Sequence, residues 1–223
     1  MANIDNILFD CDGVLVDTEI VAARVMVEQL QSLDIDINVG TYLTECTGRT
    51  FSGIFRDFMD KGQLDPELKL DEIIASLEQR IFEGTTPIIG VNQALDQIQI
   101  RKSVVSNSNV YQIQHALESA GISKHFGSRM FSSMHVEKPK PSPLVYLYAL
   151  KSLRVPKERC IVIEDSLSGT KAAKSAGMTV IGFTGGSHIV DGHKEKLEAL
   201  GVLTVCEKHE DLPDLISDIT KSS

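Results

Sequence analysis

The sequence predicts an α/β protein: a doubly wound, Rossmann-like parallel sheet with helices on both faces and a second, smaller α-helical domain. Two observations carry this prediction. Short apolar, β-branched runs alternate with helical patterns along most of the chain, as in strand–helix units whose strands are buried on both faces. One long segment after the first strand shows only helical periodicity and is too long for an ordinary connection.

Six runs have the length and composition of strands. They cover residues 7–10, 103–106, 129–132, 160–164, 179–183 and 203–206. Helical patterns alternate with the later strands and cover residues 110–120, 143–152, 168–176, 194–200 and 212–220. This alternation predicts parallel strands joined by helical crossovers.

The long segment between the first two strands is predicted to form a helical cap domain. Apolar residues recur at helical spacing over 19–33, 51–60 and 68–82, and Pro87 between two glycines marks the return to the sheet. We therefore expect a core domain of residues 1–16 and 85–223 and a cap domain of residues 17–84. A lobe on two adjacent linkers is placed to open and close over the strand ends.

Composition limits the function classes. The net charge is −9 and no basic patch is visible, which argues against a nucleic-acid partner. No apolar stretch approaches the roughly 18 residues of a membrane span, and no signal-peptide pattern is present. The four cysteines form no C-x-x-C pair, so reduced thiols are expected. We expect a soluble cytoplasmic protein, a monomer or a weak homodimer.

The first strand ends in two carboxylates one residue apart. Asp10 and Asp12 follow the apolar residues 7–9, and Gly13 comes next. Two negative side chains beside a buried strand repel each other and lose hydration unless a cation lies between them. Gly13 allows a sharp turn or the close approach of a ligand. The pattern favours a divalent metal and a phosphoryl group at the end of a parallel strand; the alternative is an ordinary turn.

Two further strands end in polar residues that suit an anion and a metal. Ser106 and Asn107 precede a predicted helix, where a hydroxyl and backbone N–H groups can hold an anionic oxygen; the alternative is a plain helix cap. Glu164 and Asp165 end the fourth strand, and adjacent carboxylates suit Mg²⁺.

A proline-rich segment contributes two lysines. Residues 138–143 read Lys-Pro-Lys-Pro-Ser-Pro, and the prolines keep the chain extended until a helix begins near Pro143. A lysine held stiffly at this point can balance carboxylates and a phosphate. The alternative is a solvated loop, and these residues alone do not separate Lys138 from Lys140.

Taken in order, these four motifs resemble those of the haloacid dehalogenase-like hydrolase superfamily, in particular its β-phosphoglucomutase-like members with a small helical cap. The resemblance spans essentially the whole chain. It implies that Asp10 is a nucleophile that forms an aspartyl-phosphate and that Asp12 is the general acid and base. Such relatives place the lysine 24 residues before the Glu, a spacing that selects Lys140 as the third catalytic residue over Lys138.

The resemblance also implies the remaining groups of the site. The metal is Mg²⁺, held by Asp10, Asp12, Glu164 and Asp165, and the phosphate- or substrate-binding residues are Gly13, Ser106, Asn107 and Arg49. Arg49 ends Thr47-Gly48-Arg49, which matches a cap loop that reaches substrate in these relatives; the alternative is a surface arginine. Leu144 stands where the lysine motif usually has an Asp, and the loop 183–188 receives no catalytic role.

The function implied is Mg²⁺-dependent hydrolysis of a small phosphorylated metabolite, a sugar or sugar-acid phosphate, with 6-phosphogluconate one candidate. One alternative is a β-phosphoglucomutase-type phosphomutase, which the absence of a His in residues 17–20 disfavours. A second is a non-catalytic binding protein on the same fold, which the retention of every charged group disfavours. Dehalogenation is disfavoured because it does not use a second carboxylate such as Asp12.

Overall fold

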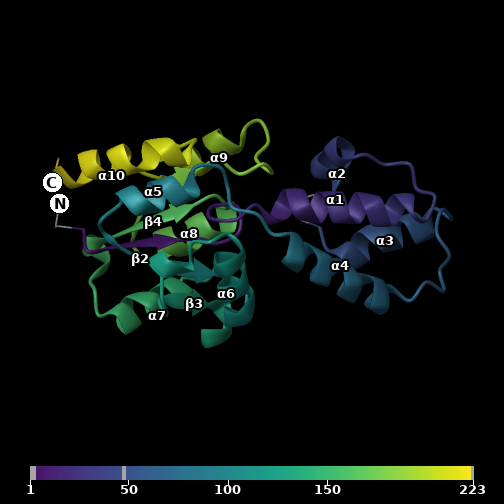
Figure 1. Ribbon diagram of the computed structural model, residues 1–223, viewed down its shortest axis with the longest axis horizontal. Helices are drawn as coiled ribbons and strands as arrows, with labels where there is room; N and C mark the ends of the chain where they lie inside the picture. The colour runs from purple at the N-terminus through teal and green to yellow at the C-terminus, as the bar shows by residue number, and fades with distance from the viewer. Residues whose placement is uncertain (1–3, 47–48, 222–223) are drawn as a thin grey trace. The chain divides into compact units, whose positions relative to one another are not determined.

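The computed structural model describes residues 4–46 and 49–221 of the chain. The chain divides into two compact units, Met1–Asp17 with Thr86–Ser223, and Thr18–Thr85. The first unit contains the sheet and the second is built from helices (Figure 1). These boundaries lie one residue further along the chain than the expected ones.

The core unit is built on a six-stranded parallel sheet with the strand order β3-β2-β1-β4-β5-β6. The strands are β1 Asn6–Phe9, β2 Arg101–Ser106, β3 Met130–Ser132, β4 Cys160–Glu164, β5 Thr179–Phe183 and β6 Thr204–Cys206. The predicted fold class is therefore confirmed. Strands β4 and β5 were predicted to their exact ends, and each of the other four strands differs from its predicted range by one or two residues at one end or both.

The strand order reverses beside β1, and this reversal positions the site. Phe9 of β1 pairs with Val104 of β2 on one side and with Ile163 of β4 on the other. The chain runs outward from β1 to β3 and then returns to β4 across the sheet. In open α/β sheets the crevice at such a switch point, at the carboxyl ends of the strands, is where ligands bind.

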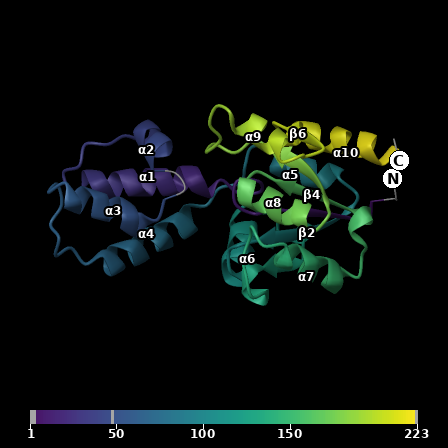
Figure 2. The same ribbon diagram turned by 180° about the vertical axis from the view of Figure 1, so that it is seen from behind.

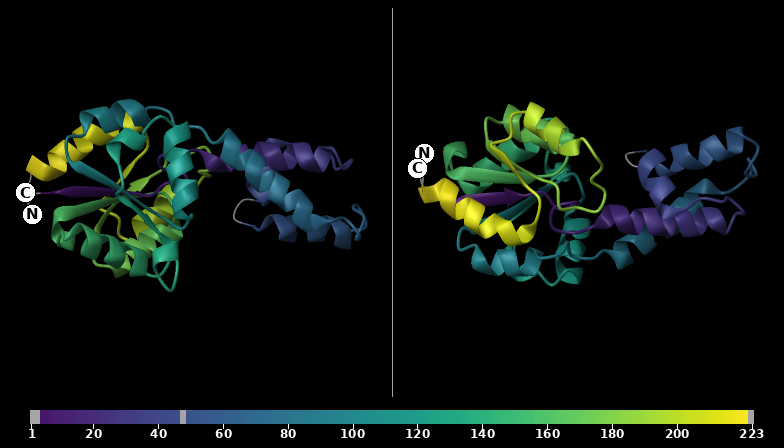
Figure 3. Two further views of the ribbon diagram at one scale, coloured as in Figure 1. Left: turned by 60° about the horizontal axis from the view of Figure 1, so that its bottom comes forward. Right: turned by 90° about the horizontal axis from the view of Figure 1, so that it is seen from above.

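Helices cover both faces of the sheet (Figure 3). They are α5 Val91–Gln97, α6 Val110–Ser119, α7 Leu144–Leu153, α8 Leu167–Ser175, α9 His193–Ala199 and α10 Leu212–Lys221. Side chains of α5, α6 and α10 share one buried cluster with Ile7 and Phe9, whereas those of α7 and α8 share another with Leu8. Helix α9 packs against β5 and β6 (Figure 2). Because alternate residues of β1 enter opposite clusters, its sequence is apolar without interruption.

The helical unit has its own hydrophobic core. Its helices are α1 Thr18–Gln31, α2 Val39–Glu45, α3 Phe51–Asp60 and α4 Leu70–Gly84. Helix α1 packs against α2 and α4, and Met26, Leu30 and Leu77 are fully buried between them and their neighbours. Among the residues that the structure describes, every helix in either unit is too short or too polar to traverse a lipid bilayer.

A buried histidine supports the turn that follows β1. His209, in the 3₁₀ turn His209–Asp211, is fully buried, and its Nε2 lies 2.6 Å from the carbonyl oxygen of Val14. Since a carbonyl only accepts, Nε2 carries the proton in this bond. Burial lowers the pKa of His209 below its ordinary value of 6.5, against the opposing effects of the Val14 bond and Glu210. The ring is therefore neutral in the folded protein at neutral pH.

This histidine makes a contribution to stability that depends on pH. Its pKa is lower in the folded than in the unfolded chain, so the unfolded chain binds more protons below about pH 6.5, and stability is lost as the pH falls from there. We expect His209→Gln, which keeps a donor for Val14, to reduce the slope of unfolding free energy against pH by up to about 1.4 kcal/mol per pH unit. Urea unfolding measures this slope at about pH 7.5, 6.5 and 5.5, which are values around the ordinary pKa of histidine. Equal slopes in the two proteins would contradict the assignment.

Candidate active site

Asp10 lies at the switch point, one residue beyond β1. Its backbone N–H donates to the carbonyl of Ile163 at 2.9 Å, so the pairing with β4 extends to Asp10 itself. The residue is only 8% exposed. Burial raises the pKa of its carboxyl well above the ordinary value, Glu164 raises it further, and Lys140 opposes both. A carboxylate here needs cations beside it in order to stay ionised.

Lys140 supplies one of these cations. Its buried Nζ donates to Oδ1 of Asp10 at 2.7 Å, to Oε1 of Glu164 at 2.7 Å and to the carbonyl of Val105 at 2.8 Å. Burial alone lowers the pKa of Lys140, but Asp10 and Glu164 together raise it well above the ordinary value, so the ammonium stays charged. An ammonium has three N–H donors, and all three are used. Lys140 is thus placed to neutralise the carboxylates.

The backbone of Lys140 is held by Asn107. Oδ1 of Asn107 accepts from the Lys140 N–H at 2.9 Å, and Nδ2 donates to the Lys140 carbonyl at 3.3 Å. Lys138, two residues earlier, is exposed. The structure therefore brings Lys140 into the cluster and leaves Lys138 outside it. Both polar atoms of the Asn107 amide are used in hydrogen bonds to the backbone of Lys140.

Glu164, the last residue of β4, accepts four hydrogen bonds from the protein. Besides Lys140, its Oε1 accepts from the Tyr146 hydroxyl at 3.3 Å, while Oε2 accepts from the Ser166 N–H at 2.9 Å and the Ser166 hydroxyl at 3.0 Å. The carboxylate fits against α8 only because residue 169 is Gly: a Cβ there would lie 1.5 Å from Oε1. Glu164 is held rigidly beside Asp10.

Asp165 differs from Glu164 in having an oxygen without a partner. The residue is 3% exposed, and burial, followed by Glu164, raises the pKa of its carboxyl well above the ordinary value. Oδ2 lies 2.9 Å from Nε2 of His188, but the buried Oδ1 has no hydrogen-bond partner among the described residues. Leaving such an acceptor unpaired in the interior costs on the order of 1–3 kcal/mol.

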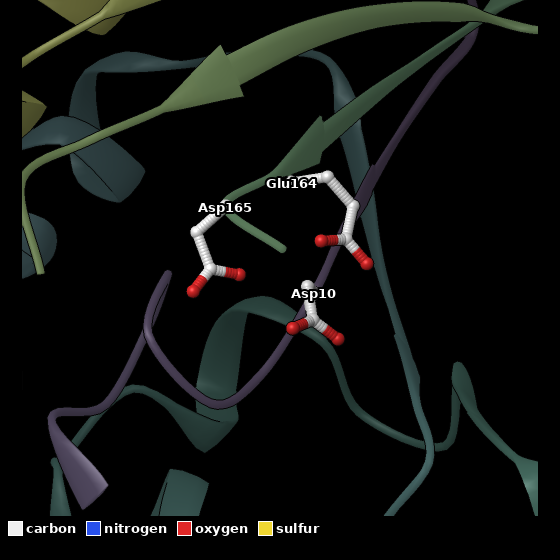
Figure 4. A group of neighbouring side chains, drawn as sticks. All are labelled: Asp10, Glu164 and Asp165. Carbon is white, nitrogen blue, oxygen red and sulfur yellow. The ribbon is translucent and has the colours of Figure 1, made fainter. Parts of the chain in front are cut away.

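These three carboxylates can hold a metal ion. Ligand oxygens of Asp10, Glu164 and Asp165 all lie within 4.8 Å of one another, and the side chains gather at one end of the sheet (Figure 4). When all three carboxylates are ionised, the single ammonium of Lys140 leaves two negative charges to be balanced. The unpartnered Oδ1 of Asp165, the all-oxygen donor set and this charge fit a hard divalent cation such as Mg²⁺.

The structure does not bring the side chain of Asp12 into this group. Its Oδ2 accepts from the Ser108 hydroxyl at 3.0 Å and lies 3.5 Å from the Ser106 hydroxyl. Ser106 also accepts from the Ser108 N–H at 3.0 Å. The end of β2 therefore orients the second carboxylate. The cap of α6 is Asn109, whose side chain accepts from Gln112, so Ser108 is left to hold Asp12.

Arg49 lies in the helical unit. It is exposed and forms an ion pair with Asp57 at 2.5 Å. It also lines a hollow of about 290 Å³ within that unit. The lining residues are Arg49, Thr50, Phe51, Ser52, Ile74 and Glu78. The two other residues of the predicted cap motif, Thr47 and Gly48, lie outside the described residues.

Gly13 has two reasons to be glycine. Its φ is +81°, a left-handed conformation that disfavours side chains, and a Cβ there would lie 2.1 Å from Oδ2 of Asp165. We expect Gly13→Ala to displace the Asp165 carboxylate and to weaken divalent-metal binding at least about tenfold, as loss of a ligand's support does.

The matched control for this substitution is Gly121→Ala. Gly121 has a φ of +69° and no atom within 4 Å of a built Cβ, so it has the same backbone strain without the clash. Gly121→Ala should lose on the order of 1 kcal/mol of stability and keep the metal affinity of the wild type, whereas Gly13→Ala should lose metal affinity as well. Titration with Mn²⁺, followed by the electron paramagnetic resonance of the free ion, measures this. Equal metal affinities in the two variants would show that the space at Gly13 is not needed.

Comparison with known proteins places the chain among hydrolases. Residues 7–183 match the family described as haloacid dehalogenase-like hydrolase. The chain is similar to the 6-phosphogluconate phosphatase of Escherichia coli, with 27% identity over 84% of this chain and 86% of that protein. It is also similar to a phosphorylated carbohydrates phosphatase of Thermotoga maritima, with 27% identity over 96% of this chain and 98% of that protein.

Solved structures share the whole architecture. A conserved haloacid dehalogenase-like protein of unknown function from Agrobacterium tumefaciens superposes with a TM-score of 0.82 at 32% identity, covering 97% of this chain and 99% of the other. A HAD family hydrolase from Deinococcus radiodurans, solved with bound phosphate and sodium, superposes with a TM-score of 0.87 at 26% identity, covering 98% and 97%.

Proposed function

Because this chain belongs to the haloacid dehalogenase-like hydrolase family, we propose that it is a Mg²⁺-dependent phosphatase that releases phosphate from a small phosphorylated sugar or sugar acid. The observation that carries the proposal is the buried group at the switch point. There Asp10 contacts Lys140 at 2.7 Å, and its carboxylate lies within 4.8 Å of Glu164 and Asp165. This arrangement supports the assignment of a nucleophile, a fixed cation and a metal site to one place.

The first step uses Asp10 as the nucleophile. Lys140 holds Oδ1, so Oδ2 is the oxygen that we expect to attack phosphorus. A bond forms between Oδ2 and phosphorus, and the bond from phosphorus to the substrate oxygen breaks. Asp12, oriented by Ser108, gives its proton to that leaving oxygen. The products of this step are the free sugar and an aspartyl-phosphate.

The second step restores Asp10. Asp12 takes a proton from water while the water oxygen attacks phosphorus, and the bond between phosphorus and Oδ2 breaks. Lys140 balances the carboxylate that returns, since its Nζ already contacts Oδ1. Asp10, Glu164 and Asp165 are the residues that would hold Mg²⁺, which when bound neutralises their charge and that of the phosphoryl oxygens.

The substrate class rests on similarity to the two sugar-phosphate phosphatases above, which makes 6-phosphogluconate the first compound to test. The experiment is a phosphate-release screen with the purified protein, Mg²⁺ and a panel of phosphorylated sugars, sugar acids and non-sugar metabolites. We expect release from sugar or sugar-acid phosphates, complete loss on chelation and recovery when Mg²⁺ is added back. Release that is unaffected by chelation, or confined to non-sugar esters, would contradict the proposal.

A further inference from the structure

The loop that follows β5 reaches the candidate metal site through His188. Nε2 of His188 lies 2.9 Å from Oδ2 of Asp165, and the two side chains are 13% and 5% exposed. The contact joins two separate segments of the core, the end of β4 and the loop after β5. None of the four sequence motifs includes this loop.

Glycines on two sides make room for the imidazole. A Cβ at Gly13 would lie 2.7 Å from Cε1 of His188, and one at Gly186 would lie 2.7 Å from the same atom. Both distances are shorter than real Cβ contacts allow. The ring therefore occupies a slot between the turn after β1 and its own loop, and only glycine at both positions leaves this slot open.

The loop is anchored at two points that precede His188 in the chain. The Thr184 N–H donates to the carbonyl of Cys206 at 2.9 Å, which extends the pairing of β5 with β6. The Ser187 hydroxyl donates to Oδ1 of Asp17 at 2.7 Å, directly before His188. These bonds fix the backbone from which the imidazole projects.

We propose that His188 is a positioning residue that orients the Asp165 carboxylate for the divalent metal. The inference rests on the proposed function, since it gives a task to a residue beside that site. A carboxylate turns easily about its terminal torsion, and a donor on one oxygen removes this freedom. With Oδ2 held by His188, Oδ1 is the oxygen left for the metal, and it is also the buried oxygen without a partner among the described residues.

A second histidine, His193, also contacts Asp165 but does not orient its carboxylate. Nε2 of His193 contacts the same residue, but at its backbone carbonyl, at 2.6 Å. This contact is with the backbone of Asp165 and not with its side chain, so it does not orient the carboxylate. His193 thus provides a matched control, because its imidazole contacts Asp165 without contacting the carboxylate.

The test compares metal affinity in four proteins: the wild type, His188→Leu, His188→Gln and His193→Leu. Mn²⁺ is the probe, titrated by the electron paramagnetic resonance of the free ion, with Mg²⁺ in competition. We expect His188→Leu to bind Mn²⁺ at least about tenfold more weakly, the usual cost of losing a hydrogen bond that supports a ligand. His188→Gln, whose amide N–H can reach the same oxygen, should recover most of the affinity, and His193→Leu should stay within about twofold.

Thermal unfolding without metal provides the fold control, with similar midpoints expected for the three variants. Unchanged affinity in His188→Leu would overturn the inference, as would equal losses in His188→Leu and His193→Leu or no recovery in a folded His188→Gln. The wild type separates this inference from the proposed function. If the wild type neither binds the metal nor releases phosphate, the proposed function fails. If it does both and His188→Leu matches it, only the role of His188 fails.

Discussion

Asp10→Asn is expected to remove turnover while preserving the fold. The amide has the shape of the carboxylate but is a poor nucleophile, so the loss should be at least about 10³-fold. The fold should tolerate the change, because Asp10 is a buried carboxyl whose pKa burial raises, and the neutral amide avoids the cost of charging it. Steady-state phosphate release, together with the unfolding midpoint, measures both effects.

The control for this variant is Asp5→Asn. Asp5 lies before β1 and pairs with Arg159 at 2.6 Å, and both side chains are more than one third exposed. Losing a surface pair of this kind has little effect, so this variant should keep its activity. Activity above a few per cent in pure Asp10→Asn would exclude Asp10 as the nucleophile.

Lys140→Ala should lose most of its turnover, and Lys138→Ala should lose almost none. Removing a preorganised cation beside developing charge costs on the order of 3 kcal/mol, or about two powers of ten in rate. Lys140 contacts Asp10 and Glu164 at 2.7 Å each, whereas Lys138 is exposed. An exposed charge two residues away should change turnover by less than about threefold.

This pair of lysines is its own matched control, because the residue type, the charge and the proline-rich segment are the same. Turnover of each variant under saturating Mg²⁺ and substrate decides between them. The reverse result, with Lys138→Ala inactive and Lys140→Ala active, would mean that Lys138 and not Lys140 is the lysine that enters the site.

The strand-end residues could be predicted because their position in the sheet follows from the sequence. Asp10 and Glu164 each end an apolar run, and parallel strands bring such ends to one edge of the sheet. The spacing of the motifs indicated which lysine to choose. The structure adds two details. Lys140 uses all three of its N–H donors in bonds to the protein, and Asp165, unlike Glu164, has a carboxylate oxygen without a hydrogen-bond partner among the described residues.

The supporting residues could not be predicted, because their partners are distant in the chain. Ser108 follows β2 but bonds to Asp12 across 96 residues, and in the sequence it is equally acceptable as a helix cap. Tyr146 lies on the buried side of α7, where an aromatic residue needs no function to explain it. His188 lies in a glycine-rich loop whose position over Asp165 depends on β5 and its anchoring bonds.

Two helices were also missed, for a simpler reason. Helices α2 and α5, Val39–Glu45 and Val91–Gln97, have seven residues each. Seven residues are two turns, too few for helical periodicity to stand out in a window of about 11–18 residues. Helix α9 is equally short, but it lies between two predicted strands, where the strand–helix alternation indicates a helix. Asn38, whose side chain caps α2, is the local signal that could have revealed the first of them.

The central claim is that Asp10 carries the phosphoryl group, and one measurement tests it directly. In Asp12→Asn the second step lacks its base, while a substrate with a good leaving group, such as p-nitrophenyl phosphate, does not need an acid in the first. The variant should therefore accumulate the intermediate in the presence of Mg²⁺. After an acid quench and proteolysis, mass spectrometry should find one added phosphoryl group on Asp10, and chelation of the metal should abolish it. A phosphoryl group on another residue, or release of p-nitrophenol at the wild-type rate without any phosphorylated peptide, would contradict the account.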